Sequence, residues 1–368
     1  MDSMNKINFK ENILNNIKNK YVLRQIFDNL KQNKSLKIIK YSKLMQQKLG
    51  IGIIDFKNYY ELIEIELIPT IKKKKNNFIN FLPKSKSYYH IYFNDDNSKE
   101  IKRNYFTKND NVKKIKIIID KEINSFEKLF EYCSCIKKIN FIKFNRKDIN
   151  NMKSMFSGCT SLINLNFSNF NTDNVTNMSW MFSGCSYLHS LNLSNFNTDK
   201  VIDMNWMFAN CSLLGELNLN NFNTINVLDM NSMFFRCFSL EKLFINNFNT
   251  KNVSNMKSMF EECSSLKELN INNFDTSNVI NMNCMFLKCL SIKELNIINF
   301  KLIKVKDMSE MFEQCLSLEE LNLNDFYFNK NNIKMDYMFS GLSREFKNNI
   351  KNKFKYFYNK YEAFLDNY

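Results

Sequence analysis

Hydrophobic and polar positions alternate in two different ways within a 26-residue pattern that recurs between residues 126 and 342. In the first part of each unit the apolar residues are three, three, one and three positions apart, which predicts one face of a short helix. In one unit these residues are Val175, Met178, Met181, Phe182 and Cys185. In the second part apolar and polar residues alternate as in a strand, at Leu188, Leu191, Leu193 and Phe196. Each unit is therefore predicted to run strand, corner, short helix and corner.

Such a unit is too small to bury its own apolar side, so neighbouring copies are expected to stack on a shared core. The recurring phenylalanines supply the large apolar area of that core, and methionine fills its irregular gaps. The pattern predicts an α/β fold, a leucine-rich-repeat-type solenoid with a parallel strand ladder along one side. A small helical N-terminal region is predicted to precede it.

One cysteine occupies the same place in each of seven units: Cys159, Cys185, Cys211, Cys237, Cys263, Cys289 and Cys315. Cysteine behaves as a small buried hydrophobe, so we interpret this row as a structural core ladder. Seven equivalent thiols cannot all form disulfides with one another. A zinc site needs ligand pairs or nearby histidines, and the chain has only 2 histidines. A catalytic thiol would be a single residue rather than one per unit.

The segment "MFSGCSYLHSLNLSNFNTDKVIDM" resembles the BspA-like leucine-rich-repeat family. It is more closely similar to the 26-residue Met-Phe-x-x-Cys repeats first described as an uncharacterised family in mycoplasma surface proteins. The resemblance covers residues 126–342. It implies a right-handed α/β solenoid with a protein-binding or adhesive role, and a surface location for many members.

The candidate partner-binding face is the row between the last two leucines of Leu-x-x-Leu-x-Leu, which points away from the predicted core. Its members are Asn166, Asn192, Asn218, Phe244, Asn270, Asn296 and Asn322. Phe244 interrupts the asparagines, and Ile298 lies on the adjacent row, so an exposed apolar contact is one interpretation. The alternative is an asparagine ladder that only solvates the sheet.

The flanking regions complete the predicted domain organisation. Residues 1–60 form a helical N-terminal region, whose segment "YVLRQIFDNL" faintly resembles an F-box without its Leu-Pro and Trp. Residues 61–125 are β-rich capping or atypical first coils, with a hairpin around Asp95 to Asn97 and a strand in "VKKIKIIID". The repeats span 126–342, and residues 343–368 form a C-terminal capping helix.

The net charge of +15 comes from residues 1–150, whereas the repeats are nearly neutral. The sequence contains no signal peptide and no stretch as long as a membrane span, so a cytoplasmic location is expected, with a surface location as the alternative that the resemblance implies. No phosphate-binding, dinucleotide-binding or nucleophile motif is present. The sequence thus predicts no enzyme and no cofactor.

These observations predict a non-catalytic scaffold that binds a protein partner through its exposed strand face. No specific nucleic acid and no transmembrane segment are expected, while weak contact with a membrane surface through the C-terminal helix is an alternative. The other predicted functions are a surface or adhesive repeat protein and an F-box-like ubiquitin-ligase substrate receptor. Oligomeric state and partner identity stay open.

Overall fold

The computed structural model describes residues 46–47, 62–71, 74–81, 85–120, 123–144, 146–322, 333–353 and 361–366. The chain divides into two compact units, Met1–Leu62 and Ile63–Tyr368. Only Gln46 and Gln47, which are helical, and Leu62 belong to the described part of the first unit. The helical region predicted for residues 1–60, with its F-box-like segment, otherwise lies outside the described residues.

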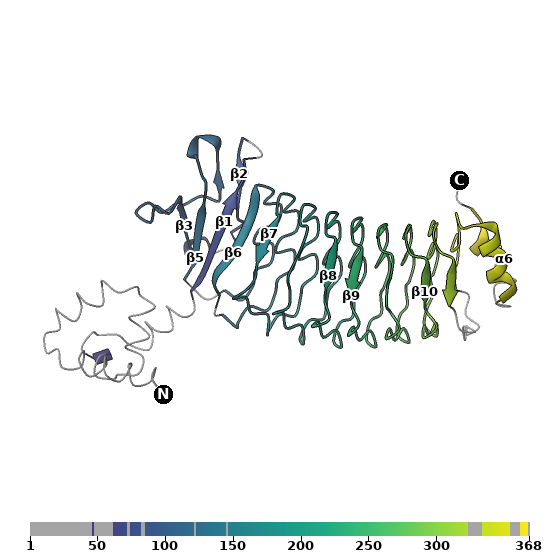
Figure 1. Ribbon diagram of the computed structural model, residues 1–368. Coiled ribbons are helices and arrows are strands. Elements are labelled where there is room, and N and C mark those ends of the chain that lie inside the picture. The colour runs from purple at the N-terminus through teal and green to yellow at the C-terminus, as the bar shows by residue number, and fades with distance from the viewer. Residues whose placement is uncertain are drawn as a thin grey trace, which may run out of the picture. The chain divides into compact units, whose positions relative to one another are not determined.

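The second unit begins with a five-stranded sheet of order β3-β5-β1-β6-β7 (Figure 1). Its strands are β1 (Ile63–Pro69), β3 (Tyr89–Phe93), β5 (Ile115–Ile119), β6 (Ile136–Phe144) and β7 (Asn164–Asn166). β1 is antiparallel to β5 and to β6, whereas β6 is parallel to β7. β6 therefore joins the antiparallel sheet to the first repeats.

The strand predicted in residues 112–120 is present as β5, whose alternate isoleucines are buried. At the predicted hairpin around Asp95 to Asn97 the chain turns and returns to β3 through one backbone hydrogen bond, from the N–H of Ile101 to the C=O of Ile91 at 2.8 Å, but the returning segment forms no strand with β3. β3 pairs with β5, and β4 (Tyr105–Phe106), which follows the turn, pairs with β2 (Asn76–Asn77). Two short 3₁₀ helices, η1 (Lys86–Tyr88) and η2 (Lys108–Asp110), lie in the connections. β3 and β5 bury alternate residues on the same side, which suits their pairing.

Each repeat contains a methionine block, as in residues 177–185, and these blocks form turns rather than helices. Two residues in each block have left-handed backbone angles, as Trp180 (φ 60°) and Gly184 (φ 73°) do. An α-helix needs right-handed angles throughout. The N–H of Met181 instead donates to the C=O of Met178, and the N–H of Cys185 to the C=O of Phe182. Turns that close over three residues give apolar side chains nearly the spacing of a helix.

Hydrogen bonds of the methionine blocks also join successive units, which lie side by side in Figure 1. The N–H of Met178 donates to the C=O of Asp203, and the N–H of Phe182 donates to the C=O of Met207 in the next unit. Parallel bridges link each Asn or Asp before the methionine block to its counterpart, from Ser125 through Asp307 to Lys334. About half of the backbone donors of the block thus bind the neighbouring unit, where a helix would bind its own turn.

The predicted fold class, an α/β leucine-rich-repeat-type solenoid with a parallel strand ladder, is wrong. The structure consists mostly of small mixed sheets, and within the described part of residues 63–368 the single α-helix is α6 (Arg344–Lys353), after the repeats. The strands of the repeats form separate pairs: β8 (Glu216–Asn218) with β9 (Lys242–Phe244), and β10 (Glu294–Asn296) with β11 (Glu320–Asn322). Residues 190–192 and 268–270 form no strand, so no ladder continues along the side.

The core of the repeats is built from rows of identical side chains. Phenylalanine rings of successive blocks stack nearly parallel, as in Phe208 and Phe234, whose centroids are 5.7 Å apart with an interplanar angle of 2°. Each row cysteine donates from its Sγ to the C=O of a phenylalanine in the preceding unit, and Cys237 reaches Phe208 at 3.2 Å. The thiols therefore bridge neighbouring units as well as filling space.

A buried threonine row gives a second link between units. The hydroxyl of Thr224, which is completely buried, donates to the C=O of Asn249 at 2.9 Å and accepts from its N–H at 2.7 Å. One side chain therefore satisfies both backbone groups of a residue in the next unit. Thr172, Thr198 and Thr276 occupy equivalent places in their own units.

Replacing Thr224 with valine is expected to lower the free energy of unfolding by about 2–4 kcal/mol, because it leaves the buried N–H and C=O of Asn249 without partners. Urea unfolding followed by circular dichroism measures this loss. Thr224→Ser keeps the hydroxyl and is the matched control. Equal stability of the valine and serine variants would contradict the role of the hydroxyl.

The last units are followed by α6 and the short helix η4 (Tyr361–Phe364). Phe346 and Ile350 of α6 are buried, and the ring of Phe364 lies 5.1 Å from that of Phe339 in the final methionine block. The side chain of Lys347 pairs with Asp366 at 2.6 Å. Apolar side chains of both helices thus pack at the C-terminal end of the repeats.

Candidate binding surfaces

The asparagines of the predicted partner-binding row are mostly turn-forming residues. The Oδ1 of Asn192 accepts a hydrogen bond from the N–H of Ser194 at 3.0 Å. Equivalent bonds are made by Asn166, Asn218, Asn270 and Asn296. An asparagine that bonds the backbone two residues later stabilises a turn. These side chains are exposed, but their oxygens are already engaged in the corner that ends each strand segment.

Phe244 breaks this arrangement. It is half-buried at the end of β9 and pairs with Asn218 in the parallel register. Because phenylalanine has no acceptor, the N–H of Asn246 turns to the Oδ1 of Asn220 in the preceding unit, at 3.0 Å. Phe244 thus places an apolar ring in an otherwise polar row. Ile298, which is 41% exposed, lies further along the same face.

A depression lies on the same face, where the strand pairing is interrupted between β7 and β8. Its lining includes Ser190, Asn192, Glu216, Asn218 and Asn221. Here a long backbone bond, from the N–H of Gly215 to the C=O of His189 at 3.4 Å, and the side chain of Asn221, which donates to the C=O of Leu193 at 3.0 Å, link the two units. The strand face is thus uneven: it has a polar hollow, and one unit further along it has an apolar ring.

The seven row cysteines lie in the core with exposed fractions of 0–2%. Burial raises the pKa of every one of these thiols, to about 12 for Cys237 and Cys315. A thiol is a nucleophile and a metal ligand only when deprotonated. The row therefore consists of protonated thiols whose hydrogen-bond partners are backbone carbonyls.

The methionine blocks carry a second surface, which the sequence analysis did not identify. The indole rings of Trp180 and Trp206 stack with centroids 4.5 Å apart and an interplanar angle of 2°. The ring of Phe235 lies 5.2 Å from that of Trp206, and the guanidinium of Arg236 lies 4.9 Å from the Phe235 centroid. Arg236 also pairs with Glu262, Nε to Oε2, at 3.0 Å. The signal was present, since the 2 tryptophans of the chain are 26 residues apart.

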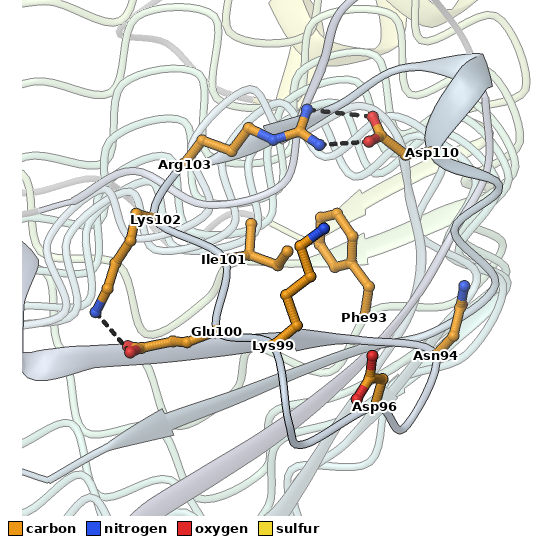
Figure 2. A pocket seen from close by; sticks show the side chains of 9 residues that line it. All are labelled: Phe93, Asn94, Asp96, Lys99, Glu100, Ile101, Lys102, Arg103 and Asp110. Carbon is orange, nitrogen blue, oxygen red and sulfur yellow. Dashed lines mark hydrogen bonds and ion pairs between the residues drawn. The ribbon is translucent and has the colours of Figure 1, made fainter.

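A third candidate is a pocket between the end of β3 and η2, shown in Figure 2. Phe93 and Ile101 contribute apolar lining, and the side chain of Lys99 extends across it. Arg103 forms a bidentate ion pair with Asp110, which lowers the pKa of that carboxyl to about 2.

The charges around this pocket largely cancel. Lys102 pairs with Glu100 at 2.6 Å, while Lys99 has no ion pair among the described residues. One exposed lysine in an open, electrically balanced pocket is a weak basis for recognising a ligand, so we do not place the function here.

Comparison with known sequences agrees with the repeat pattern. A family model described as "Mycoplasma protein of unknown function, DUF285" matches residues 124–244 and 238–353. This bears out the similarity to mycoplasma-type repeats and gives no support to the BspA-like leucine-rich-repeat assignment. No curated protein matches the chain. None of the helices in the described part of the chain has the length and apolar character needed to cross a membrane.

Proposed function

The chain belongs to the DUF285 family of Mycoplasma proteins of unknown function, and we propose that it is a non-catalytic scaffold that binds another protein. The observation that carries this proposal is the contrast between the inside and the outside of the repeats. Inside, phenylalanine, cysteine and threonine recur in successive units and make the same contacts, until Leu302 and Leu342 end the threonine and cysteine rows. Outside, the asparagine row is nearly constant, but the row beside it differs between units, as at Ser190, Glu216 and Lys242. A surface free of folding constraints and long enough to contact a partner is typical of repeat proteins that bind proteins.

Repetition also argues for binding rather than catalysis. A catalytic site needs unlike groups that converge on one point. Many polar side chains of the repeats form rows of one residue type, and their oxygens and N–H groups serve turns and links between units. The remaining polar groups of the strand face are spread along it.

We place a partner contact on the strand face around Phe244, next to the polar hollow. An apolar ring beside a polar, solvent-accessible rim has the composition of a small protein interface. Phe244 makes a sharp test possible, because the chain itself shows which residue the fold accepts at this place. Asparagine stands there in six of the other units of the row.

Replacing Phe244 with asparagine is expected to leave the fold intact and to weaken the partner complex by about tenfold or more, the usual loss when an aromatic anchor is removed. The wild-type and variant chains are immobilised, and proteins retained from a lysate of the native cells are compared by mass spectrometry. Lys251→Asp, an exposed change in the same unit, is the control. A partner retained equally by all three chains would contradict this placement, and no retained protein above the bare support would contradict the scaffold function.

A further inference from the structure

The aromatic residues on the methionine blocks are not required by the fold. Trp180 and Trp206 have φ angles of 60° and 56°, a conformation that bulky side chains rarely adopt. In neighbouring units serine stands at the same place, at Ser154, Ser232 and Ser258, with the same backbone angles. The tryptophans therefore occupy positions where a small polar residue suffices for folding.

The two indoles begin a continuous track along the turns, which we define by Trp180, Trp206, Phe235, Arg236, Glu261 and Glu310. Trp206 is flanked by aromatic rings on both sides, Trp180 and Phe235. Trp180 is half-buried and contacts no second ring among the described residues; the equivalent position in the preceding unit is Ser154, whose small side chain leaves room for a planar or cationic group beside the indole. From Trp180 to Glu310 the track spans five steps between units, or roughly 24 Å at the spacing of about 4.8 Å between neighbouring parallel segments.

Arg236 shows which chemistry this surface accepts. Its guanidinium lies over the ring of Phe235 and forms an ion pair with Glu262 in the next unit. A cation over an aromatic face, next to a carboxylate, is the arrangement in which arginine is most often recognised. The chain thus holds one of its own arginines on the track in the way that it would hold an arginine from a partner.

Two further carboxylates of the track have no ion pair among the described residues. Burial raises the pKa of Glu261, and the carboxylates of Glu262 and Glu310 add to the effect. Glu310 lies beside the thiol of Cys284, with Oε2 3.6 Å from Sγ. A hydrogen bond from Ser258 and the charge of Arg236 oppose this rise in pKa at Glu261, but Arg236 is itself paired with Glu262. A positively charged side chain placed between Glu261 and Glu310 would relieve the repulsion between them.

We propose that this track binds an extended segment of a partner protein that is rich in arginine or lysine. The proposal rests on the scaffold function above and names a second surface and the class of partner that it fits. One cationic side chain stacks on the indole of Trp180, and another lies between Glu261 and Glu310. A track of roughly 24 Å accommodates about seven residues of extended chain at 3.3 Å per residue. Arginine suits it better than lysine, because the planar guanidinium both stacks on rings and pairs with carboxylates.

The 2 tryptophans of the chain both lie on the track, so intrinsic tryptophan fluorescence reports directly on its occupation. The probe is an eight-residue peptide of alternating arginine and serine. Binding of the fluorescein-labelled peptide to the full chain is measured by the anisotropy of the label. In a parallel titration the unlabelled peptide is added, and the change in tryptophan emission is measured. A peptide with citrulline in place of arginine has the same shape without the charge. We expect the arginine peptide to bind and the citrulline peptide to bind at least about tenfold more weakly.

Variants locate the binding. The double change Trp180→Ser and Trp206→Ser uses the residue that neighbouring units carry, and it is expected to weaken binding by about tenfold or more. Glu261→Gln with Glu310→Gln is expected to weaken it by about fivefold. The matched control, Glu268→Gln with Glu294→Gln, removes the same charge from the strand face and should leave the affinity unchanged.

Equal weakening by the strand-face control would show nonspecific attraction and overturn the proposal. So would unchanged tryptophan emission while the anisotropy rises, because the peptide would then bind elsewhere. Failure of the arginine peptide to bind also refutes the inference, whereas a protein partner sensitive to Phe244→Asn would still support the scaffold function. Conversely, peptide binding without any retained protein partner would support the track and contradict the scaffold.

Discussion

Replacing Cys237 with aspartate is expected to unfold the units around it at neutral pH, with a loss of about 4 kcal/mol or more in the free energy of unfolding. The side chain of Cys237 is completely buried, and its thiol donates to the C=O of Phe208. A carboxylate at this place would be charged but excluded from solvent, and it would face a carbonyl oxygen that repels it. The neighbouring row members, Cys211 and Cys263, offer no cation.

Urea or thermal unfolding followed by circular dichroism measures the effect. Cys237→Ser is the matched control, because a hydroxyl retains a donor toward Phe208 and loses only some packing; its expected cost is about 1–2 kcal/mol. Lys251→Asp introduces an aspartate on the surface of the same region and should change stability by less than about 0.5 kcal/mol. If the Cys237→Asp chain unfolds at the same urea concentration as Lys251→Asp, the buried position of the cysteine row is wrong.

Alkaline pH is expected to destabilise the protein steeply, because all ten cysteines are buried and free. Burial raises the pKa of the row thiols in the folded chain, whereas in the unfolded chain they ionise near the ordinary value of 9.0. Below that pH both states hold the proton, so this contribution to stability is fully present. Above it the unfolded chain loses protons that the folded chain keeps, and the free energy of unfolding falls by roughly 1 kcal/mol per pH unit for each thiol that unfolds.

Urea unfolding between pH 8 and pH 10 tests this expectation. Replacing Cys211, Cys237 and Cys263 with serine removes three thiols. The free energy of unfolding should then fall less steeply with pH, by the contribution of those three groups. Reaction with iodoacetamide gives a second readout that does not depend on the folding of that variant: the folded wild-type chain should react slowly at pH 8.5, and the urea-unfolded chain should react quickly. Fast alkylation of folded protein would refute the explanation.

The sequence predicted the period of the repeats and the residues that face inward, because strict recurrence at 26 positions is visible without any structure. Phe182, Met178 and Cys185 are all completely buried. The helix was predicted wrongly at the same residues. Successive turns with left-handed residues at Trp180 and Gly184 space apolar side chains much as a helix does. The φ angle at the Trp180 position cannot be deduced from residues that vary between serine, tryptophan and glutamate, and glycine occupies the Gly184 position in only some units.

The strand ladder was overestimated for a related reason. The alternation of a leucine with a second apolar residue two positions later is present in the units from Leu165 to Leu321, but pairing depends on the neighbouring unit rather than on the alternation within one. The asparagine row was assigned to partner binding because its side chains point outward. Its main contact is instead the hydrogen bond that closes an Asn turn, as between Asn218 and the N–H of Asn220. The track was missed because its tryptophans and glutamates lie in different repeats. That they share one surface is visible only when the repeats are aligned with one another.

Every link between repeats that we describe, whether through thiol, threonine, asparagine or backbone, joins residues 24 to 29 positions apart. No repeat therefore needs any other beyond its immediate neighbours. Genetic loss or duplication of one complete period would bring equivalent partners back into contact, whereas a change by half a period would not. Lineages can thus lengthen or shorten the molecule in whole steps and acquire new recognition surface without redesigning its interior.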